Sequence, residues 1–115
     1  MAIIDDLREA VTGAISAGAK EARAQGVALK GDFEDLVKPQ LDDIVVQIAA
    51  ITNDFVVQNI SKEQAQDDLA TQVDRIKPIV LGVAELALLS AQIIINTVLD
   101  ALKTAVNSAA GIALL

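Results

Sequence analysis

The stretch IKPIVLGVAELALLSAQIIIN, from Ile76 to Asn96, decides which class of fold the chain can adopt. Beyond Lys77 it contains one charged residue, Glu85, in nineteen positions. About twenty mostly apolar residues are enough for an α-helix to cross a bilayer, yet buried helices of soluble bundles have the same composition. The stretch therefore indicates a membrane span, the core of a helical bundle, or a surface covered by another copy of the chain.

The free energy of membrane insertion does not decide the matter by itself. Residues 79–99 contain twelve Ile, Leu or Val residues, which together contribute about −5 kcal/mol on an insertion scale. A carboxylate near the bilayer centre costs about 2.5 to 3.5 kcal/mol. Gln92 and Asn96 also oppose insertion. Because the sum is close to zero, insertion is not required.

The polar residues of this region fall on one side of the expected helix. At about 100° per residue they lie within roughly 80° of one another. This polar stripe consists of Glu85, Gln92, Asn96, Asp100, Lys103 and Asn107. A helix that is apolar around most of its circumference is buried on most sides. The stripe therefore favours a central helix of an assembly over a lone membrane span.

The composition of the whole chain points the same way. Its 115 residues predict one domain, residues 1–115, and 53% of them are apolar, against roughly 45–50% in average globular domains. The surplus must contact a partner, a second copy, lipid or an apolar ligand. A net charge of −7 and an aromatic content of only two Phe exclude nucleic acid as a partner, because its recognition needs clustered cations and stacking rings.

The residue types also argue against an enzyme. The chain contains no His and no Cys, which removes the most frequent general base, the thiol nucleophile and thiolate metal sites. We expect no catalytic, cofactor-binding or metal-binding residues and no cofactor. Glu85 is the one acid in an apolar setting, where a raised pKa would permit chemistry.

Helical periodicity without strand alternation predicts an all-α, four-helix bundle-like domain with a long, mostly apolar C-terminal helix. The expected helices cover residues 2–25, 32–59 with a possible break at Pro39, 62–77 and 78–110. Ser61 followed three residues later by Gln64 is a capping box that begins the third helix. A break near Lys77 is expected because the residue before Pro78 avoids helical geometry. Asp32 is the expected N-cap of the second helix, and Gly111 a C-cap of the last.

Small residues four positions apart form a ridge on the first helix, and such a ridge allows another helix to approach closely. The ridge consists of Ala10, Ala14, Gly18 and Ala22. We expect self-association through this ridge and the apolar side of the last helix. The expected interface residues of the last helix are Leu86, Leu88, Ile94, Ile95, Val98 and Leu102.

These patterns predict a non-enzymatic structural subunit that forms a homo-oligomer, as in a virion, filament or other symmetric assembly. The alternative is a membrane-associated protein, or one that binds lipid or another apolar ligand. The acidic beginning MAIIDDLREA predicts no cleaved signal peptide. The expected location is the cytoplasm or a larger assembly, with membrane association as the alternative. Ile94→Asp is expected to break the oligomer or the fold, and Asn107→Asp to be tolerated.

Overall fold

The chain folds into an all-α bundle, which confirms the predicted fold class. The computed structural model describes residues 2–86 and 88–115, without the side chain of Leu88, and that part of the chain contains helices but no strand. The helices are α1 (Ile3–Ala24), α2 (Phe33–Val56), α3 (Lys62–Val73), α4 (Ile76–Ala84) and α5 (Leu88–Ala110). The predicted long C-terminal helix is α5, and the predicted third helix corresponds to α3 with the start of α4.

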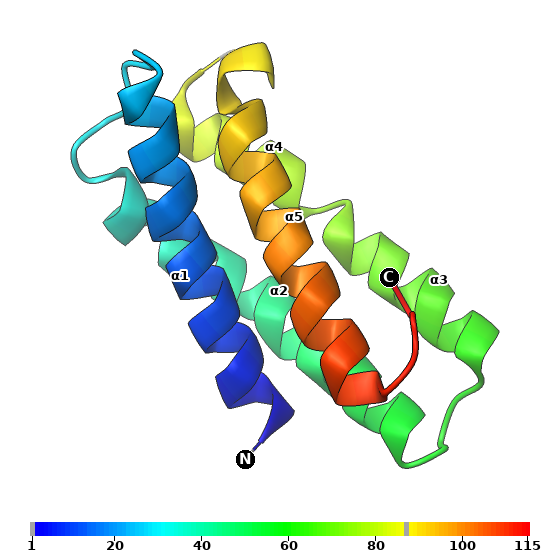
Figure 1. The fold of residues 1–115 in the computed structure, drawn as a ribbon. Coiled ribbons are helices and arrows are strands. Elements are labelled where there is room, and N and C mark those ends of the chain that lie inside the picture. Colours follow the sequence, from blue (N-terminus) through cyan, green and yellow to red (C-terminus); the bar gives the residue numbers. More distant parts are fainter. Residues whose placement is uncertain (1, 87) are drawn as a thin grey trace.

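The helices run alternately up and down along a molecule of 45 × 25 × 21 Å. Helix α1 ascends, α2 descends, α3 and α4 ascend one after the other, and α5 descends (Figure 1). Up-down topology with short connections is the usual arrangement of four-helix bundles. Two short helices, α3 and α4, together take the place of the third helix of such a bundle. Helix α3 packs mainly on α2, whereas α4 contacts both α2 and α5.

The closest helix pair is α1 and α5, which share the most extensive contact in the molecule. Gly18 lies at its centre. A Cβ atom added at Gly18 would lie 3.1 Å from the Cα of Ile94 and 3.4 Å from the Cβ of Thr97. Two helices approach this closely only where one presents no side chain. The absence of a side chain at Gly18 therefore sets the separation of α1 and α5.

The core lies mainly between α1, α2, α4 and α5, and α3 adds Ala65 and Leu69 to it. Its largest buried side chains include Phe33, Leu7, Ile15, Leu41, Ile44, Ile48, Ile94, Ile95 and Leu102. Thr52 is the one polar residue in the core among the described residues, and its hydroxyl donates to the carbonyl of Ile48 at 2.8 Å. The apolar residues that recur every three or four positions along α2, here called the α2 seam, are buried within the chain at Val37, Leu41, Ile44 and Ile48 and partly buried at Ile51 and Phe55.

The possible break at Pro39 does not occur, and the break expected near Pro78 lies earlier than predicted. Helix α2 continues through Pro39, which lies on the exposed side of the helix, where water solvates the carbonyl left without a partner. The break expected near Lys77 lies at residues 74–75, because α3 ends at Val73 and α4 begins at Ile76. Lys77 itself is helical, so the reason expected for the break is wrong. Pro78 lies in the first turn of α4, where a backbone N–H would have no helical partner in any case.

The predicted start of α3 is confirmed. The Ser61 hydroxyl accepts a hydrogen bond from the backbone N–H of Gln64 at 3.1 Å. The Gln64 side chain donates to Asp68 and does not reach back, so half of the capping box forms. Asp32 occupies the N-cap of α2 without a side-chain hydrogen bond.

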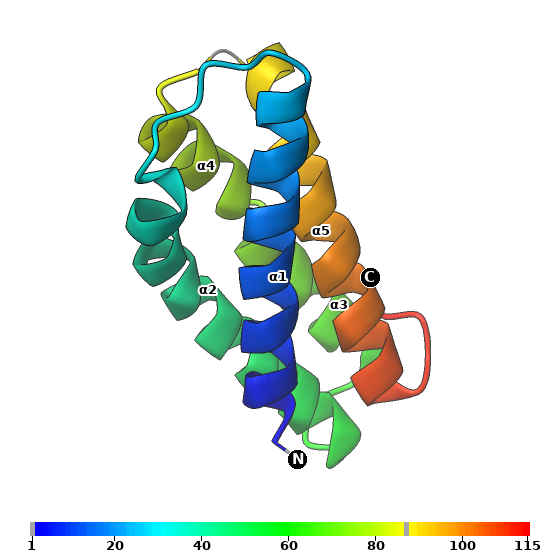
Figure 2. The ribbon, with the colours of Figure 1, turned by 60° about the vertical axis from the view of Figure 1, so that its left-hand side comes forward.

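The expected continuous helix over 78–110 is wrong, because it is interrupted at Glu85. This residue adopts a left-handed conformation, with φ 54° and ψ 38°, and ends α4. A left-handed backbone at a residue other than glycine is unfavourable by about 1–2 kcal/mol. The reversal allows α4 and α5 to pack on each other as antiparallel neighbours instead of extending as one rod (Figure 2).

After α5 the chain reverses at Gly111, whose φ of +75° is the left-handed cap expected from the sequence. The Asn107 Oδ1 atom accepts from the backbone N–H groups of Leu114 and Leu115, each at 2.9 Å. Its Nδ2 donates to the Leu115 carbonyl at 3.3 Å. Leu114 is only 3% exposed. Residues 111–115 thus form a strap beside α3 (Figures 1 and 2).

The two glycines inside α1 provide a matched test of the α1–α5 contact. A Cβ at Gly13 meets no atom within 4 Å, so Gly13→Ala should raise the free energy of unfolding by about 0.5–1 kcal/mol through helix propensity. Gly18→Ala adds the same methyl group against the α5 backbone and should be less stable than Gly13→Ala by about 1–3 kcal/mol. Urea unfolding measures both values. Equal stabilisation would contradict the close approach.

The strap can be tested at Asn107. Asn107→Ala removes three hydrogen bonds and should lower the free energy of unfolding by about 1–3 kcal/mol. Asn107→Asp keeps the oxygen that accepts from Leu114 and Leu115 and should cost less. Amide hydrogen exchange at Leu114 and Leu115 reports the strap directly. The control is Asn96→Ala, which removes only a side-chain hydrogen bond from Gln92. If Asn107→Ala leaves the protection of both amides unchanged, Asn107 does not hold the strap.

Candidate functional site

The residues predicted to form a self-association interface on the last helix lie inside the chain. Ile94, Ile95, Val98 and Leu102 are at most 1% exposed, and Leu86 is partly buried against the core. The side chain of Leu88 lies outside the described part of the structure. The prediction that these residues face another copy is corrected for the four core residues: α1, α2 and α4 of the same chain cover them. Ile94→Asp therefore tests the fold and not an interface.

The small-residue ridge is also used within the chain. Ala14, Gly18 and Ala22 are buried, and Ala10 is half-buried. The prediction that a close helix approach occurs at this ridge agrees with the Gly18–Ile94 geometry, but the approaching helix is α5 of the same chain. The assignment to contacts between copies is corrected for Ala14, Gly18 and Ala22, whereas for Ala10 it stays a prediction.

The polar stripe divides between two elements. Asn96, Asp100 and Lys103 are exposed on the outer side of α5 and Gln92 is half-buried beside them. The Gln92 side chain donates to Asn96 at 2.7 Å. Asn107 holds the strap. Glu85 does not continue the stripe, because the left-handed turn places it before α5 begins.

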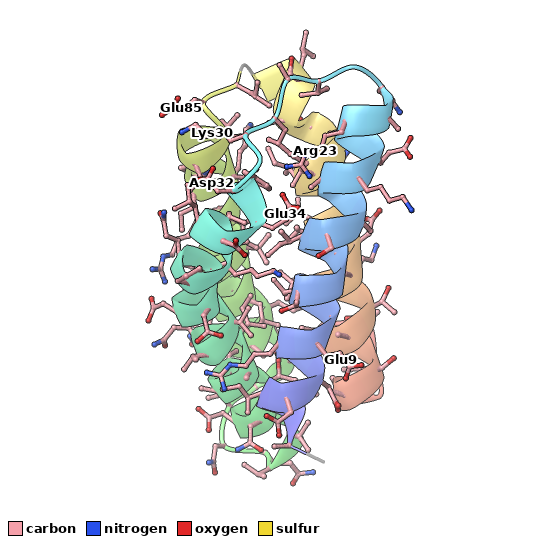
Figure 3. The ribbon with its side chains drawn as sticks, turned by 90° about the vertical axis from the view of Figure 1, so that its left-hand side faces the viewer. Glu9, Arg23, Lys30, Asp32, Glu34 and Glu85 are labelled. Atoms are coloured by element: carbon pink, nitrogen blue, oxygen red, sulfur yellow. The ribbon has the colours of Figure 1, made fainter. Side chains whose placement is uncertain are left out.

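Glu85 projects from the end of the bundle that carries the loop between α1 and α2 (Figure 3). Its side chain is 69% exposed and pairs with Lys30 of that loop at 3.0 Å. Arg23, nearby in the same view, donates to both carboxylate oxygens of Glu34 and to the Lys30 carbonyl. These contacts staple the loop to α1, α2 and the turn before α5. The environment of Glu85 is therefore solvent and a cation, and not an apolar pocket.

An apolar, open groove lies between the first turn of α1 and the second half of α2. Its volume is about 550 Å³. The lining residues are Ala2, Ile3, Ile4, Val46, Ala49, Ala50 and Asn53. Asn53 is the one polar side chain among them. The groove exists because α2 presents two adjacent alanines where α1 presents two isoleucines, so the helices leave a depression instead of interdigitating.

An ion pair joins α1 and α2 about one helical turn beyond this groove. Arg8 donates from Nε and Nη2 to the two carboxylate oxygens of Asp42, at 2.8 and 3.0 Å. The guanidinium holds the pKa of the Asp42 carboxyl below its usual range, mainly through this hydrogen bond. The pair is therefore retained until the pH falls into the acidic range. Both side chains are nearly half exposed, so the pair contributes little to the free energy of folding.

A second groove, of about 420 Å³, lies between α2 and α4 near the Lys30–Glu85 pair. It is lined by Lys30, Leu36, Gln40, Pro78, Ile79, Gly82 and Val83. With Lys30 and Gln40 in its wall it is more polar than the α1–α2 groove. A cation at the rim makes it a weaker candidate for an apolar occupant.

Several large apolar side chains remain exposed in addition to the grooves. They are Leu36, Val56, Val57, Leu89 and Ile112. Leu89 is the extreme case, since 89% of it is exposed at the beginning of α5. Sequence reasoning missed both Leu89 and the α1–α2 groove. A signal for the groove was available in the pair Ala49–Ala50, which places two small residues between Ile48 and Ile51.

The membrane alternative rests on α5. Residues Leu89–Ala110 are the one helix among those described that is long and apolar enough to cross a bilayer, and a third of its apolar 18-residue window is buried within the fold. The core helix of a soluble protein meets the same criteria. Within residues 2–86 and 88–115, no group of three or more acidic, His or Cys side chains is arranged to hold a metal ion.

The comparisons with known proteins add no relative. No protein-family model, no curated protein and no solved structure matches this chain. The function must therefore be inferred from the geometry of the grooves and the exposed apolar side chains.

Proposed function

We propose that the protein is a non-enzymatic structural subunit that assembles with copies of itself. The observation that carries the proposal is the apolar α1–α2 groove, which remains open although the chain has buried the long apolar face of α5. A contiguous apolar depression of this kind marks a contact site in a soluble protein. This groove is not the interface that was expected from the sequence. The reason for expecting self-association, an excess of apolar residues, still applies.

The surroundings of the groove favour a protein surface as its occupant over a small substrate. Apart from Asn53, its lining offers no polar side chain to orient a ligand, whereas small-molecule sites combine apolar walls with a few placed polar groups. Glu85, the acid that the sequence singled out for possible chemistry, is solvated and paired with Lys30. Neither feature supports a reaction centre.

A second candidate function, association with a membrane, is favoured by the length and apolar composition of α5. In the folded chain the apolar face of α5 packs on α1 around Gly18. Insertion would separate these helices and expose the rest of the core. Its free energy must therefore exceed the packing energy of α1 on α5, and a near-zero insertion energy does not provide this.

Multi-angle light scattering in detergent-free buffer tests the proposed assembly. The wild-type protein should be recovered from the soluble fraction with a mass that is a multiple of 12.0 kDa and that rises with concentration. A Kd of about 1 mM corresponds to a binding free energy of only about −4 kcal/mol. If the mass stays that of one chain at every concentration up to this value, self-assembly is refuted.

Vesicle flotation tests the second candidate. The folded protein should remain below zwitterionic phosphatidylcholine vesicles in a density gradient, because α5 is covered by α1. Gly18→Leu, which forces α1 and α5 apart, is the comparison variant and should float to a greater extent if α5 is the lipid-binding element. Quantitative flotation of the wild type would favour membrane association over the structural proposal.

A further inference from the structure

We infer that copies of the chain associate head to tail, with Leu89 of one copy entering the α1–α2 groove of the next. This inference rests on the proposed self-assembly and specifies its surfaces. The two surfaces lie at opposite ends of the long axis. The beginning of α1 and the beginning of α5 are separated along that axis in Figures 1 and 2. One copy can therefore use both surfaces at the same time, with different neighbours.

The projecting surface is the loop end, defined here as residues 20–38 and 79–93. Leu89 projects from it with 89% of its surface in water, and Leu36 is 43% exposed on α2 of the same end. A leucine that is exposed at the first turn of a helix contributes nothing to its own fold. Its burial by another chain would be worth about 1.5–3 kcal/mol of transfer free energy.

The receiving surface is the groove end, which comprises the other described residues and carries the α1–α2 groove. Ile3, Ile4 and Val46 provide its apolar walls, and Ala50 is exposed in its lining. A groove of about 550 Å³ has ample room for a leucine side chain with part of the adjoining turn. The small side chains of Ala49 and Ala50 allow a helix end to approach the α2 backbone.

The groove of the loop end is a poorer receptor for the same leucine. Its lining includes Lys30 and Gln40, and Lys30 is held there by Glu85. A leucine entering this groove would remove water from a charged pair, which carries a desolvation cost. The lining therefore favours contact between unlike ends over contact between two loop ends.

The charges disfavour contact between two groove ends. The loop end carries four cations and five anions, namely Lys20, Arg23, Lys30 and Lys38 against Glu21, Asp32, Glu34, Asp35 and Glu85. The groove end therefore carries the other five of the nine cations and eleven of the sixteen anions. Two groove ends, each with a net charge of −6, repel each other more than a loop end of net charge −1 and a groove end do.

Contact between unlike ends has a defined consequence for assembly. Each copy presents one projecting and one receiving surface, so the contact is heterologous and propagates as an open filament or closes as a ring. A twofold dimer would instead use the same surface on both copies.

The experiment uses two charge variants and a mixture of them. Leu89→Glu disables the projecting surface and Ala50→Glu disables the receiving surface. Both positions are exposed, and circular dichroism verifies that the fold is retained. Each variant alone should be monomeric by light scattering. A one-to-one mixture should form a dimer of twice 12.0 kDa, because the intact groove of Leu89→Glu accepts the intact Leu89 of Ala50→Glu. Ala70→Glu, an exposed position on α3 with the same change in charge as Ala50→Glu, should assemble like the wild type.

Three results would overturn the inference. If Leu89→Glu is monomeric but Ala50→Glu assembles normally, two loop ends are in contact. If both variants are monomeric and their mixture stays monomeric, the two surfaces do not contact each other. If both variants assemble like the wild type, assembly uses another face, and the proposed structural function survives without this contact. A monomeric wild type would instead refute the proposed function itself.

Discussion

The close approach of α1 and α5 at Gly18 is the constraint on which the rest of the bundle depends. Because Gly18 has no side chain, α5 can lie directly against α1. A Cβ atom placed at Gly18 would lie only 3.1 Å from the Cα of Ile94. This contact covers Ile94 and, with the neighbouring helices, Ile95, Val98 and Leu102. The core-facing side of the helix that is apolar enough to cross a membrane is thereby buried within one chain.

Once α5 is covered, the position of the remaining apolar surface follows. The left-handed turn at Glu85 reverses the chain between α4 and α5, and Leu89, one residue into α5, is left in water at the end of the molecule. At the opposite end, Ala49 and Ala50 leave the groove that Ile3 and Ile4 border. The surplus of apolar residues is therefore divided between two ends of different charge and is not spread over one helix face.

The sequence predicted the fold class well because it depends on periodicity. The seam of α2, the Ser61 cap and the Gly111 cap are local patterns whose structural effect does not depend on distant residues. The interruption at Glu85 was not predictable in this way. Glutamate has no propensity for the left-handed conformation, and the cation that its side chain contacts, Lys30, lies 55 positions earlier in the sequence.

The candidate site was harder to predict for the same reason. The sequence identified residues that prefer to be covered, such as Gly18 and Ile94, but not whether the covering helix belongs to the same chain. Pairing of α1 with α5 brings together residues about 76 positions apart, and periodicity carries no information about such pairs. The groove depends on how α1 lies on α2, which is also a property of the assembled bundle.

The most direct test of the central claim asks which chain covers α5. In a sample that mixes isotope-labelled and unlabelled protein, refolded together, NMR can separate nuclear Overhauser effects within one chain from those between chains. Contacts between the Gly18 α-protons and the Thr97 or Ile94 side chains should appear in the uniformly labelled sample and be absent from the spectrum filtered for contacts between chains. Strong Gly18–Ile94 effects in the filtered spectrum would show that another copy covers α5 and would contradict the fold described above.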